Sequence, residues 1–360
     1  MSTARTLSQS LDRIVRPTID VHRRSLSAFQ VCGVTGLALA VLLALGLVSS
    51  RGLSPWVMAA LVGTAVATFF VVAFATKIVR GEEQLVYYHH ELAVMGMTAV
   101  ALSILRQPVL AYLDATILGV GLFLACGRVG CFMVGCCHGR PHRWGVCYGH
   151  DHAQAGFPTY LVGVRLFPIQ LVEALLAATI VAVGSAMVLR GQPAGSALAW
   201  YVVAYDVGRF CLEFRRGDPG RPYYRGFSEA QWISLALTWA VVVAGALGIL
   251  PAASWHVVAA AALTGLLLGV ALKRRRDQDE AARLAGAPAD IAEQTARPQD
   301  GGLAGRQGAV VARRAATNLP VAADTVRYVP GALRLTAPGW DEQRSAAPHA
   351  GDRVAPPEAS

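Results

Sequence analysis

The chain alternates long apolar runs with short polar connections, a pattern typical of helices that cross a membrane. Residues 31–49 and 52–76 contain no Asp, Glu, Lys or Arg. Each of these runs is long enough to cross a hydrocarbon core of about 30 Å as a helix. Both are therefore predicted to be transmembrane helices.

Later apolar runs extend this pattern through the middle of the chain. They cover residues 92–105, 107–127, 166–189 and 191–212. Residues 230–272 are uncharged and too long for one crossing, but Pro251 divides them because proline cannot continue a helix. The predicted fold is all-α and polytopic, with about seven or eight transmembrane helices and a polar cavity at one face.

The two ends of the chain differ from the middle. Residues 1–30 carry five arginines and are expected to form a basic tail, with no signal peptide. Residues 31–272 form the predicted transmembrane domain. Residues 273–360 are rich in Ala, Arg and Pro and poor in large apolar residues, so a disordered tail is expected.

Composition and charge agree with a membrane protein. Hydrophobic residues make up 54% of the chain, and the net charge is +9. Basic segments beside membrane spans set topology and contact anionic lipid, so the charge requires no nucleic-acid partner. With eight helices, one side of the membrane receives twenty Lys and Arg residues and the other side three. The positive-inside rule therefore predicts that the basic side, with both termini, is cytoplasmic.

Residues 126–145, CGRVGCFMVGCCHGRPHRWG, concentrate glycine, cysteine, histidine and arginine on that side. One interpretation is a zinc or copper site formed by Cys136, Cys137, His138 and His142. The side chains of two adjacent cysteines are expected to point apart, so we predict no metal. A disulfide is the second interpretation, and it is disfavoured because thiols at a cytoplasmic face stay reduced. Packing beside glycines is the third interpretation, favoured for Cys32, Cys126 and Cys211.

The arginines of this stretch point to a phosphate ligand. Arg128 would end an apolar helix, where a guanidinium is costly unless it meets a partner or a ligand. The nearby glycines at positions 127, 130, 135 and 139 allow sharp turns and close approach. A guanidinium fork gives phosphate two charge-assisted hydrogen bonds, and a lipid headgroup is the phosphate found at this depth.

Other polar stretches fall at span ends on the same side. They are YYHHE at 87–91, FPIQLVEA at 167–174, YDVGRFCLEFRRGD at 205–218 and the following RPYYRGFSEAQW. Ionisable groups from separate span ends on one face are explained more simply by one polar site than by unrelated contacts.

The order GR-x-G-x-F-x-x-G-x-x-x-G-R at residues 127–140 resembles the hallmark of the prolipoprotein diacylglyceryl transferase family. That hallmark reads Gly-Arg-x-Gly-Asn-Phe-x-Asn-Gly-Glu-x-x-Gly-Arg. Four flanking stretches are similar to family segments in the same order, namely YYHHELAVMG, FPIQLVEA, GRFCLEFRRGD and GFSEAQWISL. The resemblance covers about residues 87–250.

The resemblance implies a transferase of the bacterial cytoplasmic membrane that needs no cofactor. Its substrates would be phosphatidylglycerol and the lipobox cysteine of a prolipoprotein, and glycerol phosphate would be released. The implied catalytic residues are His90, Arg128, Arg209 and Glu213, with Arg128 on the lipid phosphate. The general base is left open among His89, His90, Glu91 and His138. The implied substrate-binding residues are Gly127, Gly130, Cys131, Cys136, Gly139, Arg140, Gln170 and Glu173.

The chain departs from the family inside the hallmark. Cys131, Val134 and Cys136 stand where the family has Asn, Asn and Glu, and Phe167 replaces a histidine. Two alternatives therefore stay open: a related membrane enzyme that uses an anionic phospholipid with another acceptor or with its own cysteines, and a non-enzymatic lipid- or metal-binding membrane protein. The family's site opens to the outside of the membrane, whereas the charge count places it inside, so the orientation of the active face is also open.

Overall fold

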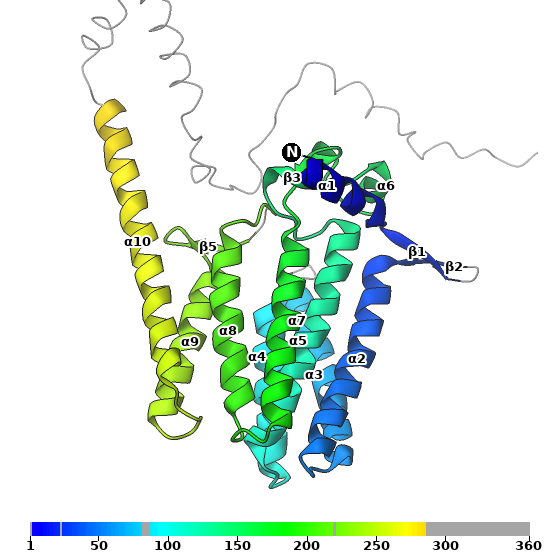
Figure 1. The fold of residues 1–360 in the computed structure, drawn as a ribbon, viewed down its shortest axis with the longest axis vertical. Helices are drawn as coiled ribbons and strands as arrows, with labels where there is room; N and C mark the ends of the chain where they lie inside the picture. Colours follow the sequence, from blue (N-terminus) through cyan, green and yellow to red (C-terminus); the bar gives the residue numbers. More distant parts are fainter. Residues whose placement is uncertain (1, 22–23, 81–86, 219–220, 286–360) are drawn as a thin grey trace, which may run out of the picture. The chain divides into compact units, whose positions relative to one another are not determined.

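The computed structural model describes residues 2–21, 24–80, 87–218 and 221–285. Most of these residues are helical (Figure 1). The first half contains α1 (Ser2–Ile14), β1 (Thr18–Val21), β2 (Arg24–Ser27), α2 (Ala28–Ser50), α3 (Pro55–Arg80), α4 (Tyr87–Ile104) and α5 (Val109–Val134). The second half contains β3 (Pro141–Cys147), α6 (His150–Gln154), a 3-10 turn (Thr159–Leu161), β4 (Arg165–Leu166), α7 (Ile169–Leu189), α8 (Ser196–Glu213), β5 (Tyr223–Tyr224), β6 (Phe227–Ser228), α9 (Glu229–Ala246) and α10 (Ser254–Ala285).

The helices form a bundle of the kind expected for a polytopic membrane protein. Among the described residues, six helices are long and apolar enough to cross a membrane, namely α2, α3, α5, α7, α9 and α10. Helices α4 and α8 lie in the same bundle but carry ionisable residues, including Glu91, Asp206 and Arg209. The all-α membrane fold is confirmed, while the count of seven or eight spans stays a prediction.

Helix α5 is the most buried of the candidate spans and contacts α2, α4, α7 and α8. Small residues allow the close approach of α2. A Cβ added at Gly36 would lie 2.6 Å from the Cys126 Cβ atom, and one added at Gly130 would lie 3.0 Å from that of Cys32. Cys32 and Cys126 thus lie at glycine contacts, as the packing interpretation expected. Cys211 differs because it is exposed.

Asp114, which interrupts the apolar run of α5, caps the beginning of another helix. Its carboxylate accepts hydrogen bonds from the backbone N–H groups of Gly195 at 2.8 Å and Leu198 at 2.7 Å. These groups lie at the N-terminus of α8, where backbone donors lack helical partners. Asp114 is therefore a structural residue at the bundle end away from residues 126–145.

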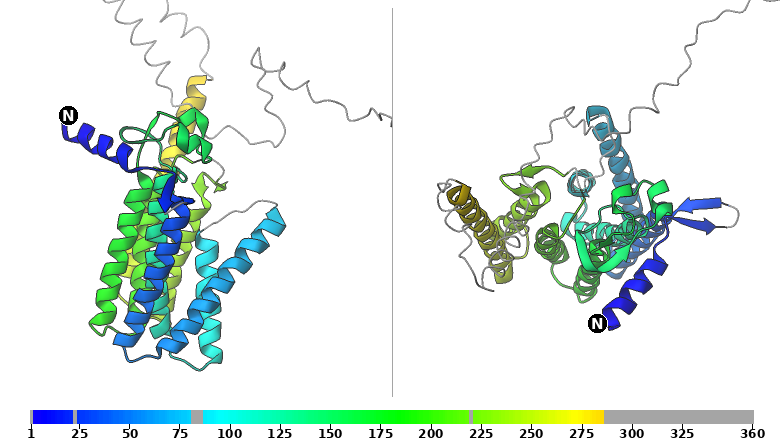
Figure 2. Two further views of the ribbon diagram at one scale, coloured as in Figure 1. Left: turned by 90° about the vertical axis from the view of Figure 1, so that its right-hand side faces the viewer. Right: turned by 90° about the horizontal axis from the view of Figure 1, so that it is seen from above.

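The connections alternate between the two ends of the bundle (Figure 1). Those joining α2 to α3, α4 to α5, α7 to α8 and α9 to α10 lie at the lower end in the picture. The other end carries α1, β3, α6 and β5, and we call it the capped end. This alternation places the predicted polar stretches together. Seen from above, the neighbouring helices α9 and α10 lie to one side of the bundle (Figure 2).

At the capped end, α1 packs on the loop that follows α5. Asp12 accepts a hydrogen bond from the Cys147 N–H group at 2.8 Å and pairs with Arg165 at 3.0 Å. Val15 joins a small apolar core that includes Phe132 and Tyr148. Part of the expected basic tail is thus a helix bound to this loop. Helix α10 continues to Ala285, past the expected domain boundary at residue 272, and the rest of the expected disordered tail lies outside the described residues.

Candidate functional site

The candidate site begins where α5 ends at the capped end of the bundle. Arg128 lies in the last turns of this helix with 8% of its surface exposed. Its Nε atom lies 3.0 Å from the Glu173 carboxylate of α7. A buried guanidinium therefore has a buried counter-charge beside it, as the cost of burying a charge requires.

Glu173 joins three helices through its carboxylate. Besides Arg128 of α5, it meets two groups of α8: the Arg209 Nε atom at 3.7 Å and the Tyr205 hydroxyl, which donates a hydrogen bond at 2.8 Å. Both arginines are almost fully buried, and Glu173 is 2% exposed. Two guanidinium groups thus share one carboxylate, leaving one excess positive charge in this triad.

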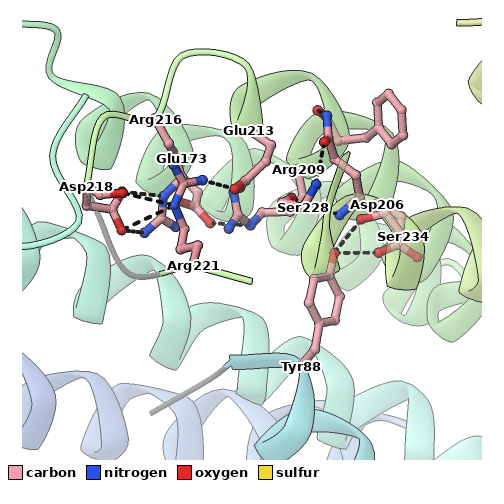
Figure 3. A network of polar contacts seen from close by, with 12 residues as sticks. Tyr88, Glu173, Asp206, Arg209, Glu213, Arg216, Asp218, Arg221, Ser228 and Ser234 are labelled. Atoms are coloured by element: carbon pink, nitrogen blue, oxygen red, sulfur yellow. Dashed lines mark hydrogen bonds and ion pairs between the residues drawn. The ribbon is translucent and has the colours of Figure 1, made fainter. Parts of the chain in front are cut away.

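The network continues through the end of α8 into the following loop (Figure 3). Glu213 pairs with Arg209 at 2.5 Å and also with Arg221. Asp218 pairs with Arg216 at 2.8 Å and with Arg221 at 3.6 Å. Burial is the largest effect on the Arg216 guanidinium and acts to lower its pKa, but the hydrogen bonds to Asp218 and the negative charges of Asp218 and Cys137 together raise that pKa. The connected network, from Arg128 to Asp218, holds four arginines and three carboxylates, so it favours an anionic ligand.

A second group of polar contacts links α4, α8 and α9. The Tyr88 hydroxyl donates to the Asp206 carboxylate at 2.8 Å and lies 2.7 Å from the Ser234 hydroxyl (Figure 3). The His89 Nε2 atom lies 3.1 Å from the Glu229 carboxylate. The predicted catalytic residue His90 is buried, and its ring lies 4.7 Å from the ring of Phe69 of α3. Its catalytic role stays a prediction.

The loop after α5 is held between the beginning of α7 and the segment after α8. Gln170 donates its Nε2–H to the Cys136 carbonyl at 2.8 Å, and the Gly217 N–H group donates to the His138 carbonyl at 3.0 Å. Arg140 donates its Nε–H to the Arg216 carbonyl at 3.1 Å. These contacts fix the loop against both neighbouring segments.

Glycine is required where this loop meets the beginning of α7. A Cβ added at Gly139 would lie 2.4 Å from the Phe167 carbonyl oxygen. Gly135, directly after α5, has φ +87°, a left-handed conformation that suits glycine. A Cβ added at Gly127 would meet no neighbouring atom within 4 Å, so the predicted contact of this residue with substrate stays a prediction.

Three cysteine thiols converge where α5 ends and this loop begins. The Sγ atoms of Cys131, Cys136 and Cys137 all lie within 4.8 Å of one another. The pKa of the Cys137 thiol is lowered well below its ordinary value because the Cys131 and Cys136 thiols hydrogen-bond to it, with Arg128 and Arg216 adding to the effect. The thiol of lowest pKa therefore belongs to Cys137, which the sequence analysis considered as a metal ligand but did not include among the implied catalytic or substrate-binding residues.

The histidines of the proposed metal set face other partners. The His138 Nδ1 atom lies 3.0 Å from the Gly139 carbonyl oxygen, and the His142 Nδ1 atom lies 3.0 Å from that of Trp144. Among the described residues, neither histidine belongs to the cluster formed by Cys131, Cys136 and Cys137. The structure thus places Cys131 beside Cys136 and Cys137, and it places both histidines elsewhere.

The structure brings together most of the predicted site residues. Arg128, Glu173, Arg209 and Glu213 form one ion-pair network, and Cys136, Gly139, Arg140 and Gln170 share the adjoining loop contacts. Sequence reasoning did not assign site roles to Tyr88, Tyr205, Arg216, Asp218 and Arg221. The spacing of Tyr205, four residues before Arg209 on one helix face, could have indicated a shared partner.

Comparisons with known proteins agree with these motifs. A sequence model of the family described as prolipoprotein diacylglyceryl transferase matches residues 25–247. A phosphatidylglycerol–prolipoprotein diacylglyceryl transferase of Clostridium tetani is 32% identical over 129 residues, covering 35% of this chain and 49% of the relative. A second enzyme of that name from Clostridium perfringens is 30% identical over 148 residues, covering 39% and 54%. The aligned part spans about half the length of each of these relatives.

Proposed function

The chain belongs to the prolipoprotein diacylglyceryl transferase family, and from this we propose that it transfers a diacylglyceryl group from phosphatidylglycerol to the lipobox cysteine of a prolipoprotein. Glycerol phosphate is released in this reaction. The names of the relatives from both clostridia support these substrates. The protein is a multi-pass membrane protein, and the bacterial cytoplasmic membrane is the proposed location.

The observation that carries the proposal is the pair of buried arginines that share Glu173. Arg128 and Arg209 come from different helices and converge on one carboxylate. A shared carboxylate fixes both guanidinium groups while leaving excess positive charge for an anion. A phospholipid phosphate at the membrane surface fits that charge and that depth.

The chemistry requires charge stabilisation at the leaving group. The acceptor sulfur attacks the glycerol carbon that bears the phosphate, and the carbon–oxygen bond breaks with its electron pair going to the phosphate oxygen. Arg128 and Arg209 would stabilise the charge that develops there. Glu213 would position Arg209 through their ion pair, and His90 is the proposed base for the acceptor thiol.

A related enzyme with a different acceptor is the second candidate, favoured by one observation. The family's Asn and Glu side chains are replaced by Cys131 and Cys136, and these thiols lie in one group with Cys137. The phosphate-binding arginines are retained beside them. The phospholipid part of the proposal therefore has more support than the identity of the acceptor.

Transfer by purified protein tests the proposal. The full-length chain, phosphatidylglycerol and a lipobox peptide are expected to give a thioether-linked diacylglyceryl peptide. Arg128→Ala and Arg209→Ala are each expected to lower kcat/KM at least about 100-fold, because each removes a donor that stabilises the developing charge. Arg190→Ala, at the far end of α7, serves as the matched control. Equal activity of the Arg128 and Arg190 variants would contradict the assigned site.

A further inference from the structure

We propose that Cys131, Cys136 and Cys137 hold one zinc ion, whose fourth coordination position binds the thiol of the acceptor. This inference rests on the proposed transferase function for the identity of the acceptor. The metal site itself rests on geometry. The zinc ion would activate the acceptor thiol in place of the family's Asn and Glu side chains, which Cys131 and Cys136 replace here.

The three sulfur atoms are already close to the spacing that one zinc ion needs. Zinc–thiolate bonds are about 2.3 Å long, so thiolates on one tetrahedral ion lie about 3.8 Å apart. The three Sγ atoms all lie within 4.8 Å of one another. Small side-chain rotations are therefore enough to close the site around an ion.

The backbone explains how two adjacent cysteines take part. Cys137 has φ +52°, a left-handed conformation that a non-glycine residue adopts at a cost of about 1 kcal/mol or more. Gly135, two residues earlier, is also left-handed. These two left-handed residues flank Cys136, and the Cys136 and Cys137 sulfur atoms lie within 4.8 Å of each other, so the expectation that adjacent cysteines point apart is wrong here.

The site has a rigid part and an accessible part. Cys131 is buried in the last turn of α5, and the Cys136 carbonyl is held by Gln170 at 2.8 Å. Cys136 is exposed, so the group reaches the surface. Within the described residues, the group has three members that could act as ligands. Three protein ligands with an open fourth position are typical of catalytic zinc, whereas structural zinc has four.

Nearby charges suit a zinc–thiolate centre. Zinc with three thiolates carries one negative charge, and with the acceptor thiolate it carries two. Arg128 precedes Cys131 by three residues on α5, and the residue after Arg216 donates its N–H to the His138 carbonyl, so both arginines lie beside this loop. The same Arg128 is the proposed phosphate ligand, so the zinc-bound sulfur and the lipid phosphate would meet at neighbouring positions.

The proposed step balances without an added oxidant or reductant. The acceptor S–H binds zinc as a thiolate, and its proton passes through water to His90, the proposed base. The sulfur then forms a bond to the glycerol carbon as the bond from that carbon to the phosphate oxygen breaks. The leaving phosphate oxygen takes the electron pair, and glycerol phosphate takes up the proton. A metal-bound thiolate remains deprotonated at neutral pH, which is the role zinc would have here.

Metal analysis of the full-length protein, purified in detergent with reductant and without chelator, tests the site. One zinc per chain is expected, with an X-ray absorption spectrum showing three sulfurs and one lighter atom. Cys137→Ser and Cys136→Ser are each expected to lower zinc affinity at least 10-fold. Cys211→Ser, which changes an exposed cysteine of α8, should retain full zinc. A cooperative thermal unfolding transition, as in the wild type, is the check that each variant is folded.

Addition of a lipobox peptide then tests the open position. We expect four sulfurs around zinc with the cysteine peptide and three with its Cys→Ser counterpart. Absence of zinc, or loss of zinc with undiminished lipidation, would overturn this inference while leaving the transferase proposal intact. Zinc that gains the peptide sulfur in a protein that lipidates nothing would support the metal site and contradict the transferase.

Discussion

Glu173 illustrates how single residues at span ends define the site. Its carboxylate is 2% exposed and meets Arg128, Arg209 and Tyr205. A buried charge in this position is tolerated because two opposite charges and a hydroxyl donor surround it. The residue therefore has a positioning role for both arginines in addition to its place in the packing of α5, α7 and α8.

Replacement of this carboxylate is expected to destabilise the protein. Glu173→Gln leaves two buried arginines without their shared counter-charge, so the free energy of unfolding should fall by about 3–5 kcal/mol. Tyr205→Phe removes one hydrogen bond to the carboxylate and should cost about 1.5–3 kcal/mol. Unfolding in detergent, followed by circular dichroism, measures both. A Glu173→Gln variant as stable as Tyr205→Phe would contradict the importance of the ion pairs.

At the scale of elements, the loop after α5 is positioned by the helices on both sides of it. Gly139 lies against the Phe167 carbonyl just before α7, and the Arg140 N–H group donates to the Arg215 carbonyl just after α8. The loop therefore couples the beginning of one helix to the end of another. Displacement of the loop would move the thiols and the arginines together.

A methyl group at position 139 tests this coupling. The Cβ atom of Gly139→Ala would lie 2.4 Å from a backbone oxygen that cannot rotate away, so the loop or α7 must shift. We expect transfer activity to fall at least 10-fold, with a loss of stability of about 1–3 kcal/mol. Gly33→Ala, where nothing lies within 4 Å of the added Cβ, is the matched control and should keep full activity. Normal transfer by Gly139→Ala would show that the loop tolerates movement.

At the scale of the whole molecule, the bundle gathers its polar connections at the capped end. Arg128, Arg209 and the thiol group all lie there with α1 and β3. The positive-inside count predicts that this end faces the cytoplasm, whereas lipidation of exported precursors requires it to face outward. The site's own arginines pair with buried carboxylates, so they are poor indicators of topology.

Labelling of Cys147 decides between these orientations. The proposed reaction predicts that a membrane-impermeant maleimide labels Cys147 on intact spheroplasts, with Cys147→Ser as the control that identifies the labelled position. Cys147 lies at the end of β3 on the capped end and is half-buried. Labelling only after the membrane is permeabilised would place the site inside and contradict the lipidation of exported precursors.

The sequence predicted the membrane bundle and the gathering of ionisable span-end residues at one face because both depend on local patterns. Arg128, Glu173 and Arg209 interrupt or end apolar runs, and such residues must find partners within the bundle. The direction of the Cys137 thiol could not be predicted, since it depends on a left-handed backbone conformation that its residue type disfavours. The contact of Tyr88 with Asp206, which links α4 to α8, could not be predicted either, because it depends on helix rotation within the tertiary structure.

The mass of a lipobox peptide after incubation with the purified protein tests the central claim most directly. With phosphatidylglycerol, the cysteine peptide is expected to gain one diacylglyceryl group, while the Cys→Ser peptide gains none and glycerol phosphate appears in equal amount. A folded wild-type protein that leaves the cysteine peptide unmodified, under conditions in which a known family enzyme modifies it, would contradict the account.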